Sequence, residues 1–383
     1  MKTEKPSRLA AFTLLAVACL TIMVGCVIVP GLPTVAKELG MSEYAGWLVT
    51  TPSLGVVIFG PLAGRLIEKC GLRRSLLLGL FFYGLLGAAG MFLSGIGIVI
   101  ADRLLLGGAT ALVMSAGTGT ISELYEGHAR LTMIARQGMA IELGGVIFLS
   151  IGGVLAALHW QAPFLLYLIA WLLAALVYCF VPHAATAQEP ETNVSDTAVS
   201  GVLKLVYFAA AASMVVFFTA ITALPIRFAG LGASETTTGY FLSFISLVAV
   251  GAAACMPRVC AWIGEFKTLA LAFLFYAAAH VLFAVANEPA LFVIGGVAMG
   301  CGFGLSIPLV NHMTVERSHV HQRARNLAYL SMAIFTGQFC SSFMNVVGAD
   351  YRRVFAAAAI LAITAWFGIA FAHRRLRVAQ RPI

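Results

Sequence analysis

Charge is scarce in this chain: Asp, Glu, Lys and Arg together make up only 10% of its 383 residues. Soluble domains carry about 25% charged residues, whereas 61% of this chain is hydrophobic. A water-soluble globule has no core large enough to hide that much apolar surface. The composition therefore excludes a soluble protein and makes lipid the solvent for most of the chain.

Reactive and metal-binding patterns are lacking as well. The eight cysteines lie mostly inside apolar runs and have no paired spacing, which is typical of small apolar residues rather than of disulfides or metal ligands. No Ser-His-Asp arrangement, metal-ligand spacing or nucleotide-binding loop occurs in the sequence. We therefore expect no enzyme, no cofactor and no metal site.

Long apolar runs are what the sequence does contain. A helix crosses a membrane in about 20 residues. The first run resembles a signal peptide that ends at Cys26, yet it stays apolar to Pro30, which favours a membrane helix. The sequence thus predicts an all-α membrane protein with twelve transmembrane helices, at residues 9–30, 45–64, 74–94, 96–118, 137–157, 161–182, 203–226, 237–257, 268–287, 290–312, 326–347 and 353–373.

The orientation of these helices follows from Lys and Arg. Only Lys37, Arg227, Arg352 and Arg353 fall on one side of the predicted membrane, and Arg103 alone falls within a span. All other members of the 24 Lys and Arg fall on the opposite side or in the tails. The positive-inside rule therefore places both termini in the cytoplasm. The same clustering accounts for the net charge of +8 without a nucleic-acid partner.

The two halves of the chain repeat each other. "LPTVAKELGMSEYAGWL" (32–48) is echoed by "LPIRFAGLGASETTTGYFL" (224–242), at an offset of 192–193 residues. The next loop on the cytoplasmic side is echoed in the same register, with Arg65, Gly71 and Arg74 matching Arg258, Gly264 and Lys267. Matches in register indicate a duplication.

We accordingly predict two pseudo-symmetric six-helix bundles, residues 1–182 and 202–383, joined by a polar cytoplasmic linker at 183–201. Two repeated bundles around a cavity at the membrane midplane are the architecture of an alternating-access transporter.

The loop "GRLIEKCGLRRS" (64–75) resembles the Gly-x-x-x-Asp-Arg-x-Gly-Arg-Arg loop of the major facilitator superfamily, although Glu replaces Asp and Lys replaces the first Arg. The resemblance implies the twelve-helix major facilitator fold and a loop that latches the bundles together in one state. The alternative is that its cations only anchor the loop at the interface. We expect its first glycine to permit close helix approach and its second to allow a tight turn. The latch residues implied are Gly64, Glu68, Lys69, Gly71, Arg73 and Arg74.

"RLLLGGATA" (103–111) resembles the family's fourth-helix motif, Arg-x-x-x-Gly-x-x-x-Ala, whose arginine is implicated in proton coupling. A charge inside the bilayer is costly, so Arg103 is expected to face the protein interior. Gly107, one turn further on, is expected to let a partner helix come close. Asp102 lies about 100° around the helix and either pairs with Arg103, through a bend or a water, or faces another helix. The alternative is a structural ion pair at the outer interface.

Glu142 is a second acid inside a predicted span, and Gly138, Gly145 and Gly152 share its helix face by spacing. A carboxylate on such a face is expected to pack against another helix, and burial favours its protonated form. Asp102, Arg103 and Glu142 are therefore our proton-coupling candidates. The alternative for Glu142 is a neutral side chain bonded to a helix carbonyl.

The same helix resembles the family's antiporter motif, Gly-Pro-x-x-Gly-Gly. Gly152 and Gly153 match this motif, but Phe148 and Leu149 stand at the Gly-Pro positions, which weakens the case for export.

Candidates for the substrate cavity are aromatic and polar residues scattered over several predicted helices. The aromatic ones suit a planar or amphipathic substrate, although such residues also face lipid. His312 falls where a helix reaches the cytoplasmic side, so a position at the helix end is its other interpretation. The set comprises Phe217, Phe218, Tyr240, Phe241, Asn311, His312 and Gln338.

The resemblance covers the whole chain and implies a secondary active transporter of the branch that exchanges drugs or metabolites for protons. We expect proton-coupled efflux of a small organic molecule by a monomer in the inner membrane of a bacterium. The first alternative is uptake of a small metabolite by proton symport. The second is a membrane sensor that does not transport, which short tails without a signalling domain disfavour.

Overall fold

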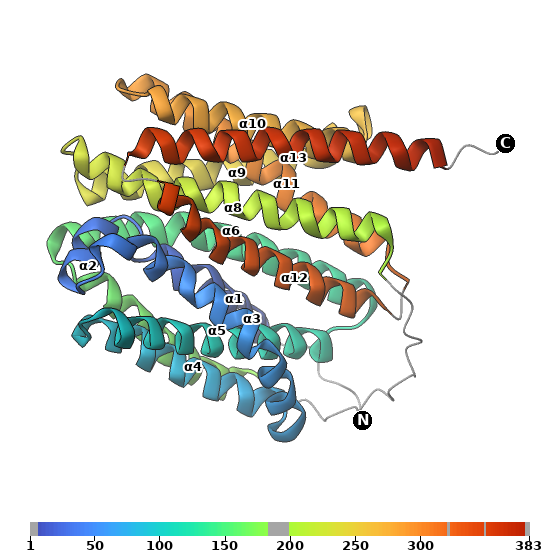
Figure 1. Cartoon of the computed structure of the whole chain (residues 1–383). Helices are drawn as coiled ribbons and strands as arrows, with labels where there is room; N and C mark the ends of the chain where they lie inside the picture. Colours follow the sequence, from blue (N-terminus) through green and yellow to red (C-terminus); the bar gives the residue numbers. More distant parts are fainter. Residues whose placement is uncertain (1–6, 183–198, 320–321, 348–349, 380–383) are drawn as a thin grey trace. The chain divides into compact units, whose positions relative to one another are not determined.

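The structure, a computed structural model, describes residues 7–182, 199–319, 322–347 and 350–379 (Figure 1). Within these ranges, twelve helices are long and apolar enough to cross a membrane. This confirms the predicted all-α membrane fold and the number of spans. The predicted linker at 183–201 lies outside the described residues except for 199–201.

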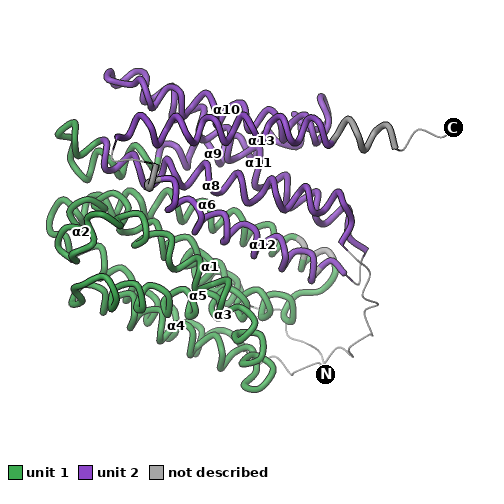
Figure 2. Tube along the Cα trace, in the orientation of Figure 1, with its two compact units in different colours: residues 1–189, 228–243 green, residues 190–227, 244–383 purple. Residues whose placement is uncertain are grey.

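The chain divides into two compact units, which Figure 2 distinguishes by colour. Unit 1 comprises residues 1–189 and 228–243, and unit 2 comprises residues 190–227 and 244–383. The boundaries between units thus pass through two helices of the second half of the chain. A division into bundles 1–182 and 202–383 stays a prediction.

Unit 1 contains the helices of the first half of the chain. They are α1 (Arg8–Cys26), α2 (Leu32–Glu38), η1 (Ser42–Tyr44), α3 (Ala45–Cys70), α4 (Leu72–Ala89), η2 (Gly90–Phe92), α5 (Ile96–Leu124), α6 (Gly127–Leu158), η3 (Ala162–Leu168) and α7 (Ile169–Phe180). The beginning of α9 also belongs to this unit.

Unit 2 contains most of the second half. Its helices are α8 (Gly201–Gly230), α9 (Glu235–Ile263), α10 (Glu265–Val285), α11 (Pro289–Glu316), α12 (Arg323–Cys340), η5 (Ser341–Val347) and α13 (Tyr351–Ala379). Residues 228–230 of α8 and 235–243 of α9 are assigned to unit 1.

The sequence repeat is also a repeat of backbone geometry. Gly40 and Gly232 follow α2 and α8 with φ of 70° and 75°. The residue after each glycine donates its N–H to a carbonyl five residues back, at 2.7 Å for Met41 and 3.0 Å for Ala233. Both turns therefore have the same helix-ending arrangement, which requires a left-handed residue and so favours glycine.

The second pair of repeated turns separates α3 from α4 and α9 from α10. Gly71 has φ 79° and Gly264 has φ 87°. Each donates its N–H to the carbonyl four residues back, at 2.8 Å and 2.9 Å respectively. The prediction of a tight turn at Gly71 is confirmed.

In each half of the chain, a buried tyrosine links the third membrane-spanning helix to the first membrane-spanning helix. The Tyr83 hydroxyl on α4 donates to the Leu20 carbonyl on α1 at 2.7 Å. The Tyr276 hydroxyl on α10 is 2.8 Å from the Ser213 hydroxyl on α8. Ser213 corresponds to Leu20 and Tyr276 corresponds to Tyr83, both at an offset of 193 residues. The internal repeat therefore extends to the core of each half.

Close backbone contact holds α3 against α5 within unit 1. A Cβ placed on Gly107 would lie 2.0 Å from the Pro52 carbonyl oxygen and 2.8 Å from the Gly55 Cα. This confirms that Gly107 lets a partner helix come close. It also fixes the rotation of α5, the helix that carries Asp102 and Arg103.

Candidate functional site

The Asp102–Arg103 pair is buried within unit 1. The Arg103 side chain is 1% exposed and that of Asp102 is 6% exposed. Arg103 donates from Nε to the Asp102 carboxylate at 3.1 Å, and its Nη2 lies 2.9 Å from the same oxygen. The two neighbours on α5 therefore pair directly, without an intervening residue.

Aromatic and small residues surround the Arg103 guanidinium. Its central carbon lies 5.4 Å from the ring centre of Phe164 and 5.8 Å from that of Tyr167, both on η3. A Cβ on Gly90, directly after α4, would lie 2.0 Å from Arg103 Nη2. The side chain thus faces the interior, as expected, while its role in proton coupling stays a prediction.

Tyr167 connects this site to the first helix. Its hydroxyl donates to the Val24 carbonyl of α1 at 2.9 Å, while its ring faces the Arg103 guanidinium. The charged pair on α5 is therefore enclosed by the first residue of η2 and by η3. A hydrogen bond from Tyr167 joins η3 to α1.

Glu142 lies in α6 and is partly buried. This helix packs on α1, where the Cys19 thiol donates to the Ala140 carbonyl at 3.0 Å. The Glu142 carboxylate is within electrostatic range of Cys26, the last residue of α1. Among the described residues, Glu142 has no hydrogen bond or ion pair. The carboxylate partner of Arg103 is Asp102, not Glu142.

The glycines around Glu142 differ in what they contact. A Cβ on Gly152 would lie 2.3 Å from the Val27 carbonyl oxygen, whereas one on Gly138 would have no neighbour within 4 Å. The face that carries Glu142 is therefore in close contact with another segment at Gly152 and open at Gly138. There the helix face is exposed.

Gly153 joins α6 to the beginning of α9, a contact within unit 1. A Cβ on Gly153 would lie 2.7 Å from the Glu235 carbonyl oxygen and 2.9 Å from the Gly239 Cα. Beside them, the Ser150 and Ser243 hydroxyls are 2.8 Å apart, and Ser243 donates to the Val146 carbonyl at 2.9 Å. We call this contact the α6–α9 seam. The Gly152-Gly153 match was its only signal in the sequence.

The cations of the 64–75 loop differ in their surroundings, because Arg73 contacts another helix and the others are exposed. Arg73 donates to the Tyr178 carbonyl of α7, and its guanidinium lies 5.3 Å from the Tyr178 ring centre. Glu68, Lys69 and Arg74 are exposed. A Cβ on Gly64 would have no neighbour within 4 Å, so the close helix approach expected there is not found in this structure. The latch role stays a prediction.

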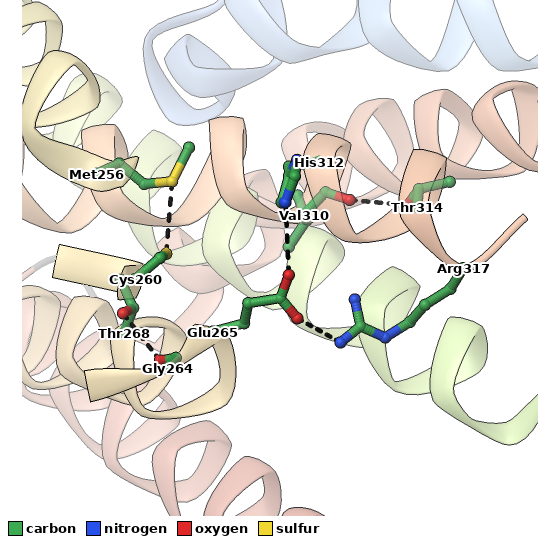
Figure 3. Close-up of polar contacts among 9 residues, drawn as sticks. All are labelled: Met256, Cys260, Gly264, Glu265, Thr268, Val310, His312, Thr314 and Arg317. Carbon is green, nitrogen blue, oxygen red and sulfur yellow. Dashed lines mark hydrogen bonds and ion pairs between the residues drawn. The ribbon is translucent and has the colours of Figure 1, made fainter. Parts of the chain in front are cut away.

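The repeated loop of unit 2 contains an ion-pair cluster that the sequence analysis missed (Figure 3). The Glu265 carboxylate accepts a hydrogen bond from the Arg317 guanidinium, and its other oxygen lies 3.5 Å from His312 Nε2. Glu265 directly follows the turn glycine at 264, and Arg317 directly follows α11. The cluster therefore ties the α9–α10 turn to the end of α11, and the acid after the repeated glycine was its signal.

Replacing Glu265 by Gln is expected to lower the stability of unit 2 by about 1 kcal/mol, because the Arg317 pair is only partly buried. Thermal unfolding of the detergent-solubilised chain measures this as a lower melting temperature. Arg317→Gln is expected to give the same loss, and the double variant no further loss. Glu288→Gln, at the exposed start of α11, is the control. Equal melting temperatures for Glu265→Gln and the parent protein contradict the prediction.

The cavity candidates fall in different places. Phe217 and Phe218 are buried on α8, and the Phe217 ring centre is 4.1 Å from that of Phe303 on α11. Tyr240 is exposed, and Phe241 packs on Phe228 at 5.0 Å. Phe217 and Phe218 belong to unit 2, whereas Tyr240 and Phe241 belong to unit 1.

The polar candidates are equally dispersed. Gln338 is buried on α12. Asn311 is exposed and donates to the Ile307 carbonyl one turn back at 2.9 Å. His312 is half exposed beside Glu265 (Figure 3). A cavity role for these seven residues stays a prediction.

The sequence pattern of the Major Facilitator Superfamily matches residues 13–340. The chain belongs to this superfamily. It is therefore a multi-pass membrane protein of a superfamily of transporters rather than of enzymes.

Two curated relatives in this superfamily are named for drug resistance. Multidrug resistance protein 1 of Bacillus subtilis is 30% identical over 179 residues, which cover 45% of this chain and 44% of that protein. Quinolone resistance protein NorA of Staphylococcus aureus is 26% identical over 140 residues, 36% of either chain. The alignments thus span less than half the length of these relatives.

Solved transporters share the fold. The nucleoside transporter NupG superposes with a TM-score of 0.75 at 14% identity, covering 94% of this chain and 99% of that one. A D-xylose-proton symporter gives 0.74 at 16% identity, covering 94% and 98%. At such identities the likeness shows the major facilitator fold alone.

Proposed function

We propose that this transporter exports a small organic molecule in exchange for protons. It acts as a monomer in a bacterial inner membrane, with both termini in the cytoplasm. The names of its relatives support export of drug-like molecules. Proton coupling is supported by one observation above all: Glu142 is a partly buried carboxylate within a membrane helix and has no ion-pair partner among the described residues.

In the proposed mechanism, the carboxylate changes its charge as the protein changes conformation. A carboxylate in low dielectric favours its neutral form, and access to water favours ionisation. A proton bound from outside therefore neutralises Glu142 in one conformation and leaves in the other. Protonation shifts the equilibrium between conformations only by its differential affinity for them. Glu142 shares α6 with the α6–α9 seam, so a movement of this helix would change both together.

Asp102 is the second candidate carrier, and Arg103 opposes its protonation. The guanidinium stabilises the charged carboxylate at 2.9 Å. Asp102 therefore takes up a proton less readily while the pair is intact than it would without Arg103. This ranks Glu142 ahead of Asp102.

Uptake by proton symport is the second proposed function. Phe148 and Leu149 replace the Gly-Pro of the antiporter motif. This departure from the motif favours uptake by symport over export. The direction of coupling separates the two proposals. A gradient that is acidic outside drives the substrate outward in an antiporter and inward in a symporter.

The test is transport by the full chain in proteoliposomes, with a quinolone and a lipophilic cation as probes. Glu142→Gln is expected to lower transport driven by a pH gradient about tenfold or more, while exchange of substrate without a gradient continues. Glu126→Gln, in the exposed residue before α6, is the matched control. If Glu142→Gln and Asp102→Asn both keep gradient-driven transport, the proposed mechanism is wrong.

A further inference from the structure

Unit 1 carries an apolar groove on its surface. The groove lies between α3 and α4, with α5 as its floor, and has a volume of about 350 Å³. Leu62 and Leu66 line it from α3, Phe82 from α4, and Leu105 and Gly108 from α5. None of the residues that line it has a charged or polar side chain.

Small residues on all three helices leave this space unfilled. Gly79, Gly108, Ala63 and Ala109 all line the groove. A Cβ on Gly108 would lie 3.0 Å from the Phe59 ring, which also lines the groove, so a larger residue at 108 would fill part of this space. The stretch of α3 that lines the groove, residues 59–66, is about 10 Å long.

The groove is turned toward the membrane rather than toward the core of the unit. Leu62 is 51% exposed, Phe82 46% and Leu105 49%. All three helices that form it are membrane spans. In a membrane, apolar side chains exposed in this way meet lipid acyl chains, because water is absent at that depth.

Two cations continue the α3 side of the groove toward the end of the helix. Arg65 follows Leu62 by three residues, Lys69 follows Leu66 by three, and both are exposed. Residues three and four apart on a helix are neighbours on one face. Long basic side chains at a helix end reach the headgroup region while their stems stay among apolar groups. One end of the groove is therefore positively charged.

We propose that this groove binds an anionic phospholipid. One acyl chain occupies the apolar groove, and the phosphate lies between Arg65 and Lys69. The charge at one end and the apolar lining elsewhere match the two parts of such a lipid. The binding follows from the residues of unit 1 alone, whereas the choice of the cytoplasmic leaflet rests on the orientation proposed above.

Native mass spectrometry of the full chain tests this proposal, with phosphatidylglycerol and phosphatidylcholine of identical acyl chains as probes. The parent protein is expected to bind phosphatidylglycerol about tenfold more tightly than phosphatidylcholine. Arg65→Gln combined with Lys69→Gln is expected to reduce this preference to less than about twofold. Arg258→Gln combined with Lys267→Gln removes two cations from the repeated loop of unit 2, where Arg258 matches Arg65 and Lys267 matches Arg74, and is expected to keep the preference.

Filling the groove tests the place of the acyl chain. Leu105→Trp and Leu62→Trp obstruct it from two different helices, and each is expected to remove the tightly bound lipid. Leu78→Trp, at an exposed apolar position of α4 outside the groove, is the control.

Equal affinity for the two lipids, or undiminished binding by both groove variants, overturns the proposal. Because binding is measured without transport, its failure is distinguishable from failure of the proposed export.

Discussion

Leucine in place of Gly239 is expected to reduce transport at least about tenfold, whereas leucine in place of Gly251 on the same helix leaves it close to that of the parent protein. A Cβ on Gly239 would lie 2.6 Å from the Leu149 carbonyl oxygen and 2.9 Å from the Gly153 Cα. The backbones of α6 and α9 must separate to admit it. Overpacking of this kind costs about 1–3 kcal/mol, which corresponds to a shift of roughly 5- to 150-fold in a conformational equilibrium.

We expect transport to fall because the substitution shifts the equilibrium between the conformations of the transporter. The Ser150–Ser243 hydrogen bond lies beside the glycine contact, so separating the helices weakens it as well. A transporter that alternates between states needs each of them to be populated. The state in which the α6–α9 seam is closed is destabilised by the substitution, and the cycle slows accordingly.

Controls for the seam are available on both helices. Gly153→Leu is expected to repeat the effect from α6. A Cβ on Gly138 of α6 or on Gly251 of α9 would meet no atom within 4 Å, so Gly138→Leu and Gly251→Leu are expected to be tolerated. Initial rates of efflux from proteoliposomes, at equal amounts of folded protein, measure the difference. Similar rates for Gly239→Leu and Gly251→Leu contradict an essential seam.

The fold was predictable because length and hydropathy decide it. Twelve apolar runs of sufficient length give twelve spans, and the structure has them. The turns were predictable for another reason. The glycine at 71 and its repeat at 264 both have positive φ, a conformation in which other residues are strained.

Helix rotation was much less predictable. Lipid tails are as apolar as a protein core, so hydrophobicity does not tell the buried face of a membrane helix from its lipid face. Small residues give an incomplete signal. Gly107 and Gly152 do contact backbone of another helix, whereas Gly64 and Gly138 have open space beside them. A glycine permits close approach without requiring it.

Partners distant in sequence were the least accessible from the sequence. Glu265 and Arg317 are separated by 52 residues, and no spacing rule connects them. Arg103 and Asp102 are adjacent, yet their direct pairing was only one of several alternatives, because neighbours on a helix point about 100° apart. The structure resolves this, since the long Arg103 side chain turns back to the Asp102 carboxylate.

Methionine in place of Arg103 is expected to destabilise unit 1 by about 3–5 kcal/mol, because removing one member of a buried ion pair leaves the other charge uncompensated. Asp102 is 6% exposed and would keep a carboxylate without its partner. Thermal unfolding in detergent measures the loss. Asp102→Asn alone is expected to destabilise as well, since it leaves the Arg103 charge buried.

The double variant Asp102→Asn/Arg103→Met separates the two interpretations of this pair. Replacing both charges by neutral groups of similar volume is often nearly neutral for stability, so the double variant is expected to recover most of the loss. Unit 2 supports this expectation. At the repeat offset of 193 residues, Phe283 corresponds to Gly90 and Gly295 corresponds to Asp102. In unit 2 these two residues pack against each other without any charge. If the recovered protein still shows transport driven by a pH gradient, the pair is structural. If it folds but loses gradient-driven transport, the pair takes part in proton coupling. An Arg103→Met protein that unfolds at the same temperature as the parent contradicts the energetic argument itself.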